Sequence, residues 1–411
     1  MTVSINDIQE ARVRLEPIIN KTPIVYDERL SKETGTKTYL KAECLQRAGS
    51  FKIRGAYNKI SQLSDDEKSR GVIAASAGNH AQGVALAATL NGIRSTIVLP
   101  DFAPLTKVVA TKGFGADVVM KGTTFDEAVA YSRQLQSEKG YTYVHAFDDE
   151  KVVAGQGTIG VEIAEARPDV NTIIVPIGGG GLISGISIAA KALIPNVRII
   201  GVQAQNIASV RPSLEAGKPL EIDAQATIAD GIAIKRPGEI TLNIIRDLVD
   251  DIVEVSEEEI AHGLFHCVQY SKLVVEGAGA AGVAAMLAGK IDLSEKEKVC
   301  VVMGGGNIDG NLLARIIEQV LVRQGRYAIF KLLVVDRPGM LATMLNHVAE
   351  TGANVIEVYH QRAIWLAPLG RVGIEMILEV RDDEHAQAVQ HHLEKTGYHV
   401  ERQGQGTWEE E

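Results

Sequence analysis

Lys52 is the side chain of this sequence whose neighbours point first to covalent chemistry. It follows Ser50 and Phe51 and opens an expected helix for which Ser50 is a suitable N-cap. The positive end of a helix disfavours a protonated amine and lowers its pKa, which is what an imine-forming lysine requires. Taken alone, the segment still favours a solvated surface lysine, because most lysines are exposed.

Residues 76–83, with the letters SAGNHAQG, form a second candidate site directly after the strand-like run 71–76. They place small residues and backbone N–H donors where a strand gives way to a helix, an arrangement that binds carboxylate or phosphate. An ordinary loop with a helix cap explains the same letters equally well.

A run of glycines after the strand-like segment 171–177 is the third candidate site. It consists of Gly178, Gly179, Gly180 and Gly181, followed by Leu182. Such a backbone can wrap closely around a phosphate at the start of a helix. Neither G-x-G-x-x-G nor a P-loop fits, because Ile183 or Ser184 replaces the third glycine and no Gly-Lys-Ser/Thr follows. The run therefore favours a small phosphate monoester over a dinucleotide or a nucleoside triphosphate.

Two further segments are expected to line the same crevice, namely residues 303–307 after the strand-like run 298–303, and residues 276–280. A lysine, an asparagine loop and a phosphate-sized glycine loop together indicate pyridoxal phosphate. This cofactor needs an imine partner, a pocket for its ring and a cradle for its phosphate.

In order and spacing, these motifs resemble the fold-type II pyridoxal-phosphate enzymes, and among them the threonine dehydratases. The resemblance covers residues 5–322 and is carried by SFKIRGA, SAGNHAQG, AGQGT, GGGGL and GGGN. It implies a catalytic region of two open, twisted α/β subdomains. The implied reaction is β-elimination from L-threonine to 2-oxobutanoate and ammonia. Some conversion of L-serine to pyruvate is expected, because one methyl group discriminates by only ~1–3 kcal/mol.

The resemblance also implies roles for individual residues. Lys52 would bind the cofactor and then remove the Cα proton of the substrate. Phe51 would pack against the pyridine ring, and Asn79 would donate to its 3-hydroxyl. The backbone of residues 178–182 would hold the phosphate. The substrate carboxylate is expected at Ser76, Gly78, Asn79 and His80.

Three departures from the resemblance bear on function. Gly304 stands where the family commonly carries a serine that bonds the pyridine nitrogen, so a water or a shifted neighbour must take that part. Ala77 replaces the second serine of related serine racemases, which argues for elimination alone. Residues 203–206 lack the carboxylates of the racemase cation site, and we expect no metal site. His391 and His392 are interpreted as solvated helix residues.

The alternation of buried strand-like runs with helical segments ends near residue 325. Segment 330–403 predicts the order βαββαβ, a ferredoxin-like unit, and resembles an ACT regulatory domain. That resemblance implies isoleucine or valine as an allosteric ligand and a homodimer or homotetramer; a domain that only mediates assembly is the alternative. We therefore expect a catalytic domain over 1–322, a linker over 323–329, the ACT domain over 330–403 and a tail over 404–411.

Composition narrows the class of protein. Strand-like runs alternate with helical patterns, which predicts an α/β architecture. A net charge of −10 argues against nucleic-acid partners. The absence of a long apolar run argues against a membrane partner. Three dispersed cysteines and no signal-peptide pattern favour the cytoplasm.

Two kinds of alternative function remain open. The chain could be a serine or 3-hydroxyaspartate dehydratase, or an amino-acid sensor that has lost catalysis.

Overall fold

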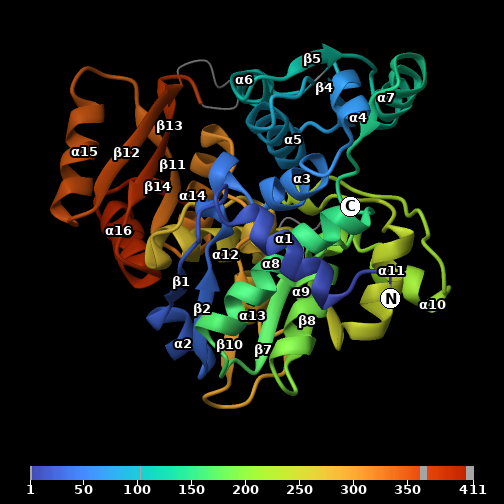
Figure 1. Ribbon diagram of the computed structural model, residues 1–411. Coiled ribbons are helices and arrows are strands. Elements are labelled where there is room, and N and C mark those ends of the chain that lie inside the picture. Colours follow the sequence, from blue (N-terminus) through green and yellow to red (C-terminus); the bar gives the residue numbers. More distant parts are fainter. Residues whose placement is uncertain (1, 102, 362–367, 404–411) are drawn as a thin grey trace. The chain divides into compact units, whose positions relative to one another are not determined.

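The computed structural model describes residues 2–101, 103–361 and 368–403, so the expected tail lies outside it. The chain forms two compact units, Met1–Asp309 and Gly310–Glu411, which are described separately. The first unit contains two sheets with helices around them, as expected for two α/β subdomains (Figure 1). No helix in the described ranges combines the length and apolar character that a membrane span requires.

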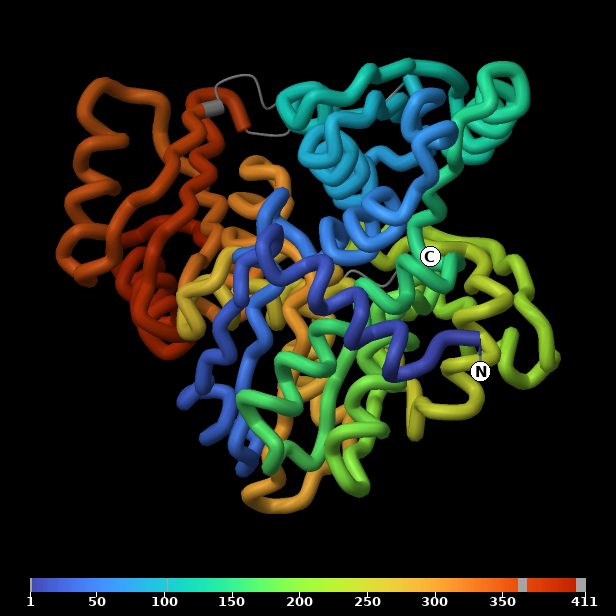
Figure 2. The backbone as a smooth tube through the Cα atoms, in the orientation of Figure 1, coloured from blue at the N-terminus to red at the C-terminus, as the bar shows by residue number. Residues whose placement is uncertain are grey.

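The larger sheet of the first unit has six strands and is parallel except at one edge. Its order is β1 (Ile24–Tyr26), β2 (Lys37–Lys41), β10 (Lys298–Val302), β7 (Thr172–Pro176), β8 (Arg198–Ala204) and β9 (Asp251–Val255). β1 pairs antiparallel with β2, and β2 pairs parallel with β10. The second and last strands of this sheet in chain order, β2 and β10, therefore lie side by side, as the blue and orange segments of Figure 2 show.

Helices cover both faces of this sheet. They are α1 (Ile5–Leu15), α2 (Glu28–Thr34), α8 (Glu150–Ala166), α9 (Gly181–Leu193), α10 (Val210–Glu215), α11 (Glu239–Leu248), α12 (Glu257–His266) and α13 (Gly277–Leu287). Ile173 and Val175 of β7 join a core with α8, α9 and α11, whereas Ile174 faces α13. Successive residues of a strand point to opposite faces, so a strand buried on both sides must be apolar throughout.

The smaller sheet is fully parallel. Its order is β5 (Asp117–Met120), β4 (Ser95–Leu99), β3 (Val72–Ala75) and β6 (Thr142–Tyr143). Its helices are α3 (Lys52–Ile60), α4 (Asp65–Arg70), α5 (Asn79–Leu90), α6 (Leu105–Gly113) and α7 (Phe125–Lys139). This subdomain is inserted between β2 and α8, so the chain passes from the large sheet to the small one and back.

Short helical turns connect these elements. They are η1 (Glu43–Leu45), η2 (Arg47–Gly49), η3 (Gln205–Ile207), η4 (Asp230–Ile232) and the π-helical η5 (Cys267–Ser271). Ser256 and Glu259 form a reciprocal capping box at the start of α12.

Glycines bring α3, α8 and α9 into close contact. A Cβ at Gly155 would lie 2.6 Å from the Arg54 carbonyl oxygen, and one at Gly157 would lie 2.9 Å from the Gly185 carbonyl oxygen. Gly155 and Gly157 belong to the segment AGQGT that contributes to the family resemblance, and both lie inside α8, where they serve helix packing.

The second unit contains a four-stranded antiparallel sheet in the order β12-β13-β11-β14. Its elements are α14 (Gly310–Arg323), β11 (Tyr327–Val335), α15 (Met340–Glu350), β12 (Asn354–Gln361), β13 (Arg371–Glu379), α16 (Asp383–Lys395) and β14 (His399–Gln403). After α14, these follow the expected βαββαβ order. One apolar core joins this sheet to α15 and α16.

The start of the second unit differs from the expected boundaries. Helix α14 groups with this unit, and β11 begins at Tyr327, inside the expected linker 323–329. The reason is pairing: β11 pairs with β13 continuously, from Tyr327 opposite Glu379 to Val335 opposite Arg371. The assignment of separate catalytic and regulatory roles to the two parts of the chain stays a prediction.

Candidate active site

Lys52 is the first residue of α3, and its amine lies within the first unit. Its Nζ donates to the Ala146 carbonyl oxygen at 3.0 Å and lies 5.1 Å from the centre of the Phe51 ring. Burial lowers the pKa of Lys52 to about 8, and the negative charge of Glu276 opposes this shift. The amine is therefore much closer to its neutral, nucleophilic form near neutral pH than an ordinary lysine.

Ser50 does not cap α3, contrary to the sequence prediction. The N-cap is Phe51, and Ser50 is extended and forms an antiparallel bridge with Gly305. This bridge holds the chain that leads into Lys52 against the glycine turn after β10, and Phe51 N–H donates to the Gly304 carbonyl oxygen at 3.1 Å. The Ser50 hydroxyl is buried and has no partner among the described residues.

Asn79, at the start of α5, belongs to a chain of side-chain hydrogen bonds. Its Nδ2 donates to Glu276 Oε1 at 2.6 Å, and its Oδ1 accepts from Asn307 Nδ2 at 2.8 Å. An amide NH2 group has two donor hydrogens, so a second one stays available beyond the bond to Glu276. α5 itself packs directly on α3, because a Cβ at Gly83 would lie 3.0 Å from Lys52 Cβ.

Glu276 belongs to the segment 276–280 that was expected to line the crevice, but the sequence predicted no role for its carboxylate. It is the N-cap of α13, is 5% exposed, and lies beside Gly305 and Gly231. Burial and the charge of Asp230 raise the pKa of Glu276 to about 7, while the bond from Asn79 opposes this shift. In the sequence, Glu276 stands directly before the small residues 277–280. A glutamate at such a position is usually an exposed surface charge, so the sequence does not indicate that it is buried.

His80 is the second residue of α5. Its ring is not suited to bind a carboxylate. The side chain is buried, and Nε2 donates to the Val144 carbonyl oxygen at 2.8 Å. Burial, together with the positive charge of Lys52, lowers the pKa of His80 to about 3. A neutral ring held in this way offers no positive charge to an anion. The backbone N–H groups of this first helical turn can bind an anion instead.

Ser76 and Gly78 complete the turn before α5. The Ser76 hydroxyl accepts from Gly78 N–H at 3.2 Å, and Gly78 is the N-cap of the helix. Together with Asn79 and His80, these residues form one continuous turn at the positive end of α5, as expected for a carboxylate site.

Residues 178–182 form the turn between β7 and α9. The outer side of this turn is closely packed, since a Cβ at Gly179 would overlap the Phe147 ring and one at Gly180 would lie 2.8 Å from Thr241 Cβ. Thr241 Oγ1 also donates to the Gly179 carbonyl oxygen at 2.6 Å. Within the described ranges, the backbone N–H groups of 178–182 donate to no protein acceptor. Buried donors without partners are what a phosphate cradle presents before its ligand is added.

Gly304 brings the glycine turns and the lysine segment together. A Cβ built at Gly304 would lie 3.4 Å from Phe51 Cδ1 and 3.8 Å from Leu182 Cδ2. Phe51, Leu182 and Gly304 therefore share one small volume, beside the Lys52 amine. Space for a side chain exists at Gly304, so packing does not impose glycine here.

A buried ion network anchors α3. Arg54 donates two hydrogen bonds of 2.8 Å to the carboxylate of Glu43, and its Nη1 donates to Glu162 Oε1 at 2.6 Å. Lys41 Nζ donates to Glu162 Oε2 at 2.5 Å. Arg54 is fully buried and lies two residues after Lys52, so the network fixes the helix that carries the reactive amine.

These features together define a pyridoxal-phosphate-dependent enzyme of fold type II. They are a lysine amine of lowered pKa, the side chains of Phe51 and Leu182 on either side of the side-chain-free Gly304, and a cradle of unpaired N–H donors at a helix start. The family model described as pyridoxal-phosphate dependent enzyme matches residues 15–305, and the chain belongs to this family.

Several known proteins are similar to this chain over most of its length. An L-threonine ammonia-lyase of Thermotoga maritima is 48% identical over 97% of this chain and 99% of its own. A catabolic L-threonine dehydratase, TdcB, of Staphylococcus aureus is 48% identical over 78% of this chain and 93% of its own.

Solved structures share this fold over about three quarters of the chain. Maize serine racemase has a TM-score of 0.74 at 37% identity, covering 79% of this chain and 99% of its own. Threonine deaminase isoform 2 from Solanum lycopersicum has a TM-score of 0.71 at 36% identity, covering 76% and 88%.

Proposed function

We propose that this chain converts L-threonine to 2-oxobutanoate and ammonia by β-elimination. The observation that carries the proposal is the Lys52 amine, whose lowered pKa and position beside Phe51 suit it to proton transfer at the substrate Cα. The names of relatives that match 97% and 96% of the chain, both L-threonine ammonia-lyases, support threonine as the substrate.

Bound pyridoxal phosphate supplies an electron sink that weakens the Cα–H bond. The N–H groups of residues 178–182 would hold its phosphate, and Phe51 and Leu182 would lie beside its ring. Asn79 would donate its second amide hydrogen to the ring hydroxyl. The turn from Ser76 to His80 binds the substrate carboxylate through backbone N–H groups, which orients the Cα hydrogen toward Lys52 Nζ.

Lys52 is the proton carrier in this proposal. Its neutral amine removes the Cα proton, the β-hydroxyl leaves with a proton as water, and the resulting enamine reacts with water to release ammonia and the 2-oxo acid. L-Serine follows the same course to pyruvate. Ala77 carries no hydroxyl, so the turn before α5 offers no second proton carrier there, and we propose elimination without racemisation.

The second unit is proposed to bind a small amino acid, isoleucine or valine. A cavity of about 340 Å³ lies between the end of β11 and the start of α15. Its apolar lining includes Val334, Val372 and Ile374, and its polar lining includes Asp336 and Arg337. The N-terminus of α15 suits a ligand carboxylate, and the apolar wall suits a branched side chain. The same unit is proposed to mediate a homodimer or homotetramer.

Rates of 2-oxo acid formation from threonine and serine test the function, each measured with and without isoleucine. The account predicts turnover of both substrates with a preference for threonine, and inhibition by isoleucine. A protein lacking residues 326–411 should retain basal turnover and lose the isoleucine response. Inhibition that persists in the shortened protein would overturn the regulatory assignment alone.

A further inference from the structure

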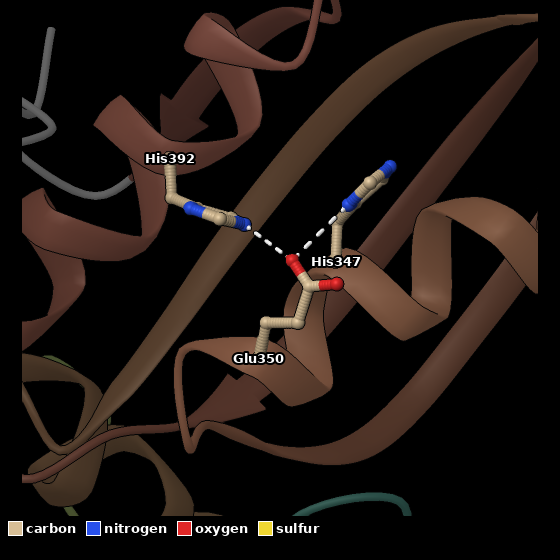
Figure 3. Close-up of side chains that lie close together, drawn as sticks. All are labelled: His347, Glu350 and His392. Atoms are coloured by element: carbon tan, nitrogen blue, oxygen red, sulfur yellow. Dashed lines mark hydrogen bonds and ion pairs between the residues drawn. The ribbon is translucent and has the colours of Figure 1, made fainter.

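Three side chains on the helical face of the second unit point toward one another (Figure 3). His347 and Glu350 lie three residues apart on α15, a spacing that places two side chains on the same helix face. His392 comes from α16. One nitrogen of each ring and one carboxylate oxygen lie within 4.8 Å of one another.

The distances match the edges of a tetrahedral metal site. His347 Nδ1 lies 3.3 Å from Glu350 Oε2, and His392 Nε2 lies 3.1 Å from the same oxygen. Zinc bonds of ~2.0–2.2 Å in a tetrahedral site place neighbouring ligand atoms about 3.3–3.6 Å apart. Two of the three distances lie close to this range and all three ligand atoms lie within 4.8 Å of one another, so small side-chain rotations would let one metal ion contact all three.

The donor set indicates the class of metal. Two imidazole nitrogens and one carboxylate oxygen suit zinc and its neighbours among the first-row metals, whereas calcium and magnesium prefer oxygen ligands. The side chains of His347, Glu350 and His392 are 26%, 58% and 34% exposed, so a fourth position faces solvent. We propose that His347, Glu350 and His392 bind one zinc-class divalent ion, with a fourth ligand from water or another molecule.

The site joins the two helices that cover one face of the sheet. α15 and α16 share an apolar core through Val348 and Leu393, and His347 and His392 each lie one residue from that contact. A metal bond between the helices would therefore add a cross-link directly above their packing interface. The sequence contained no compact motif for this site, because its histidines come from different helices.

A metal-free preparation of the full-length protein tests the proposal. It is dialysed against buffered Zn²⁺, and bound zinc is counted per chain. We expect one zinc that depends on these three residues, with an affinity at least about 10-fold lower in His392→Asn and Glu350→Gln, because losing a ligand costs no less than losing its supporting partner. His391→Asn, which changes the exposed neighbouring histidine, is the matched control and should bind like the unaltered chain.

Co²⁺ supplies a second readout, because its visible absorption is intense in a tetrahedral site and weak in an octahedral one. The unaltered chain and His391→Asn should show the intense band, and His392→Asn should lose it. Far-UV circular dichroism of the metal-free variants separates lost binding from lost folding, and His347→Asn serves if one variant unfolds. Equal zinc binding in folded variants and the unaltered chain, or no zinc retained by the unaltered chain, would overturn the proposal.

Discussion

Asn79 Nδ2 donates to Glu276 Oε1 at 2.6 Å, so a single hydrogen bond joins the first turn of α5 to the first turn of α13. Both residues lie near Lys52, and the charges of Glu276 and Lys52 shift each other's pKa in the direction that favours two ions. Burial acts against both charges. The balance between these effects brings the pKa of the lysine to about 8 and that of the glutamate to about 7.

Glu276→Gln should shift the pH at which the cofactor-free protein captures pyridoxal phosphate. Only a neutral Lys52 amine attacks the aldehyde, so capture should reach half its maximal rate near pH 8 in the unaltered chain. Glutamine keeps an acceptor for Asn79 and removes the charge that raises the lysine pKa, so the midpoint should move to lower pH. The measurement is the rate of the cofactor's absorbance change across pH. Glu215→Gln removes an exposed charge as the control, and an unmoved or raised midpoint in Glu276→Gln would contradict the coupling.

Gly304→Ser should tighten cofactor binding. The new Cβ would make ordinary contacts with Phe51 and Leu182, and its hydroxyl would place a hydrogen-bond partner near the expected ring. One such bond contributes about 1 kcal/mol, or roughly a five-fold lower dissociation constant. Equilibrium titration with pyridoxal phosphate measures it. Gly305→Ser is the comparison, because its Cβ would overlap Glu276 and should lower stability. Weaker cofactor binding in Gly304→Ser would show that no such space is available.

Arg54→Met should lower the free energy of unfolding by about 3–5 kcal/mol, because it removes both guanidinium hydrogen bonds from the buried Glu43 carboxylate and leaves Glu162 paired with Lys41 alone. Urea denaturation measures this loss. Arg246→Met breaks an exposed pair with Asp247 and should cost less than about 1 kcal/mol. Similar losses in the two variants would mean that the buried network does not anchor α3.

His80 should make the fold sensitive to acid. Its pKa is lowered to about 3 in the folded chain and returns to about 6.5 on unfolding. The unfolded chain then binds an extra proton below pH 6.5, so stability falls as the pH is lowered from 6.5 toward 3. At pH 5 the loss is about 2 kcal/mol, from 1.36 kcal/mol per pH unit.

Urea midpoints at pH 7 and pH 5 check this assignment. The stability difference between the two pH values should be about 2 kcal/mol smaller in His80→Gln than in the unaltered chain. The exposed His391→Gln should behave like the unaltered chain. An identical pH dependence in His80→Gln would mean that this ring is not held neutral.

Regular elements could be predicted closely where their signal was local. The strands and helices of segment 330–403 occur in the expected order, and β7 (Thr172–Pro176) and β10 (Lys298–Val302) lie in the strand-like runs 171–177 and 298–303. Strands buried on both faces produce continuous apolar runs, and helices with one buried face produce a period of 3.6. The capping box at Ser256 and Glu259 needs only neighbouring residues, so it too was predictable.

Features that depend on distant pairing could not be predicted in this way. β1 and β2 join the large sheet through β10, and nothing near residues 24–41 indicates that partner. Glu276 belongs to the site because it accepts a hydrogen bond from Asn79, which lies 197 residues earlier in the chain. The role of Gly155 and Gly157 also depends on distant residues, because they allow α8 to approach Arg54 of α3 and Gly185 of α9 closely.

Lys52→Ala tests the central claim most directly, with threonine turnover and the absorbance of lysine-bound cofactor measured on the same samples. Lys52→Ala should lose both signals, with folding and the second unit unaffected. The control is Lys112→Ala, which removes an exposed lysine on α6 and should keep both signals. A Lys52→Ala protein that still forms 2-oxobutanoate at the rate of the unaltered chain would contradict the account.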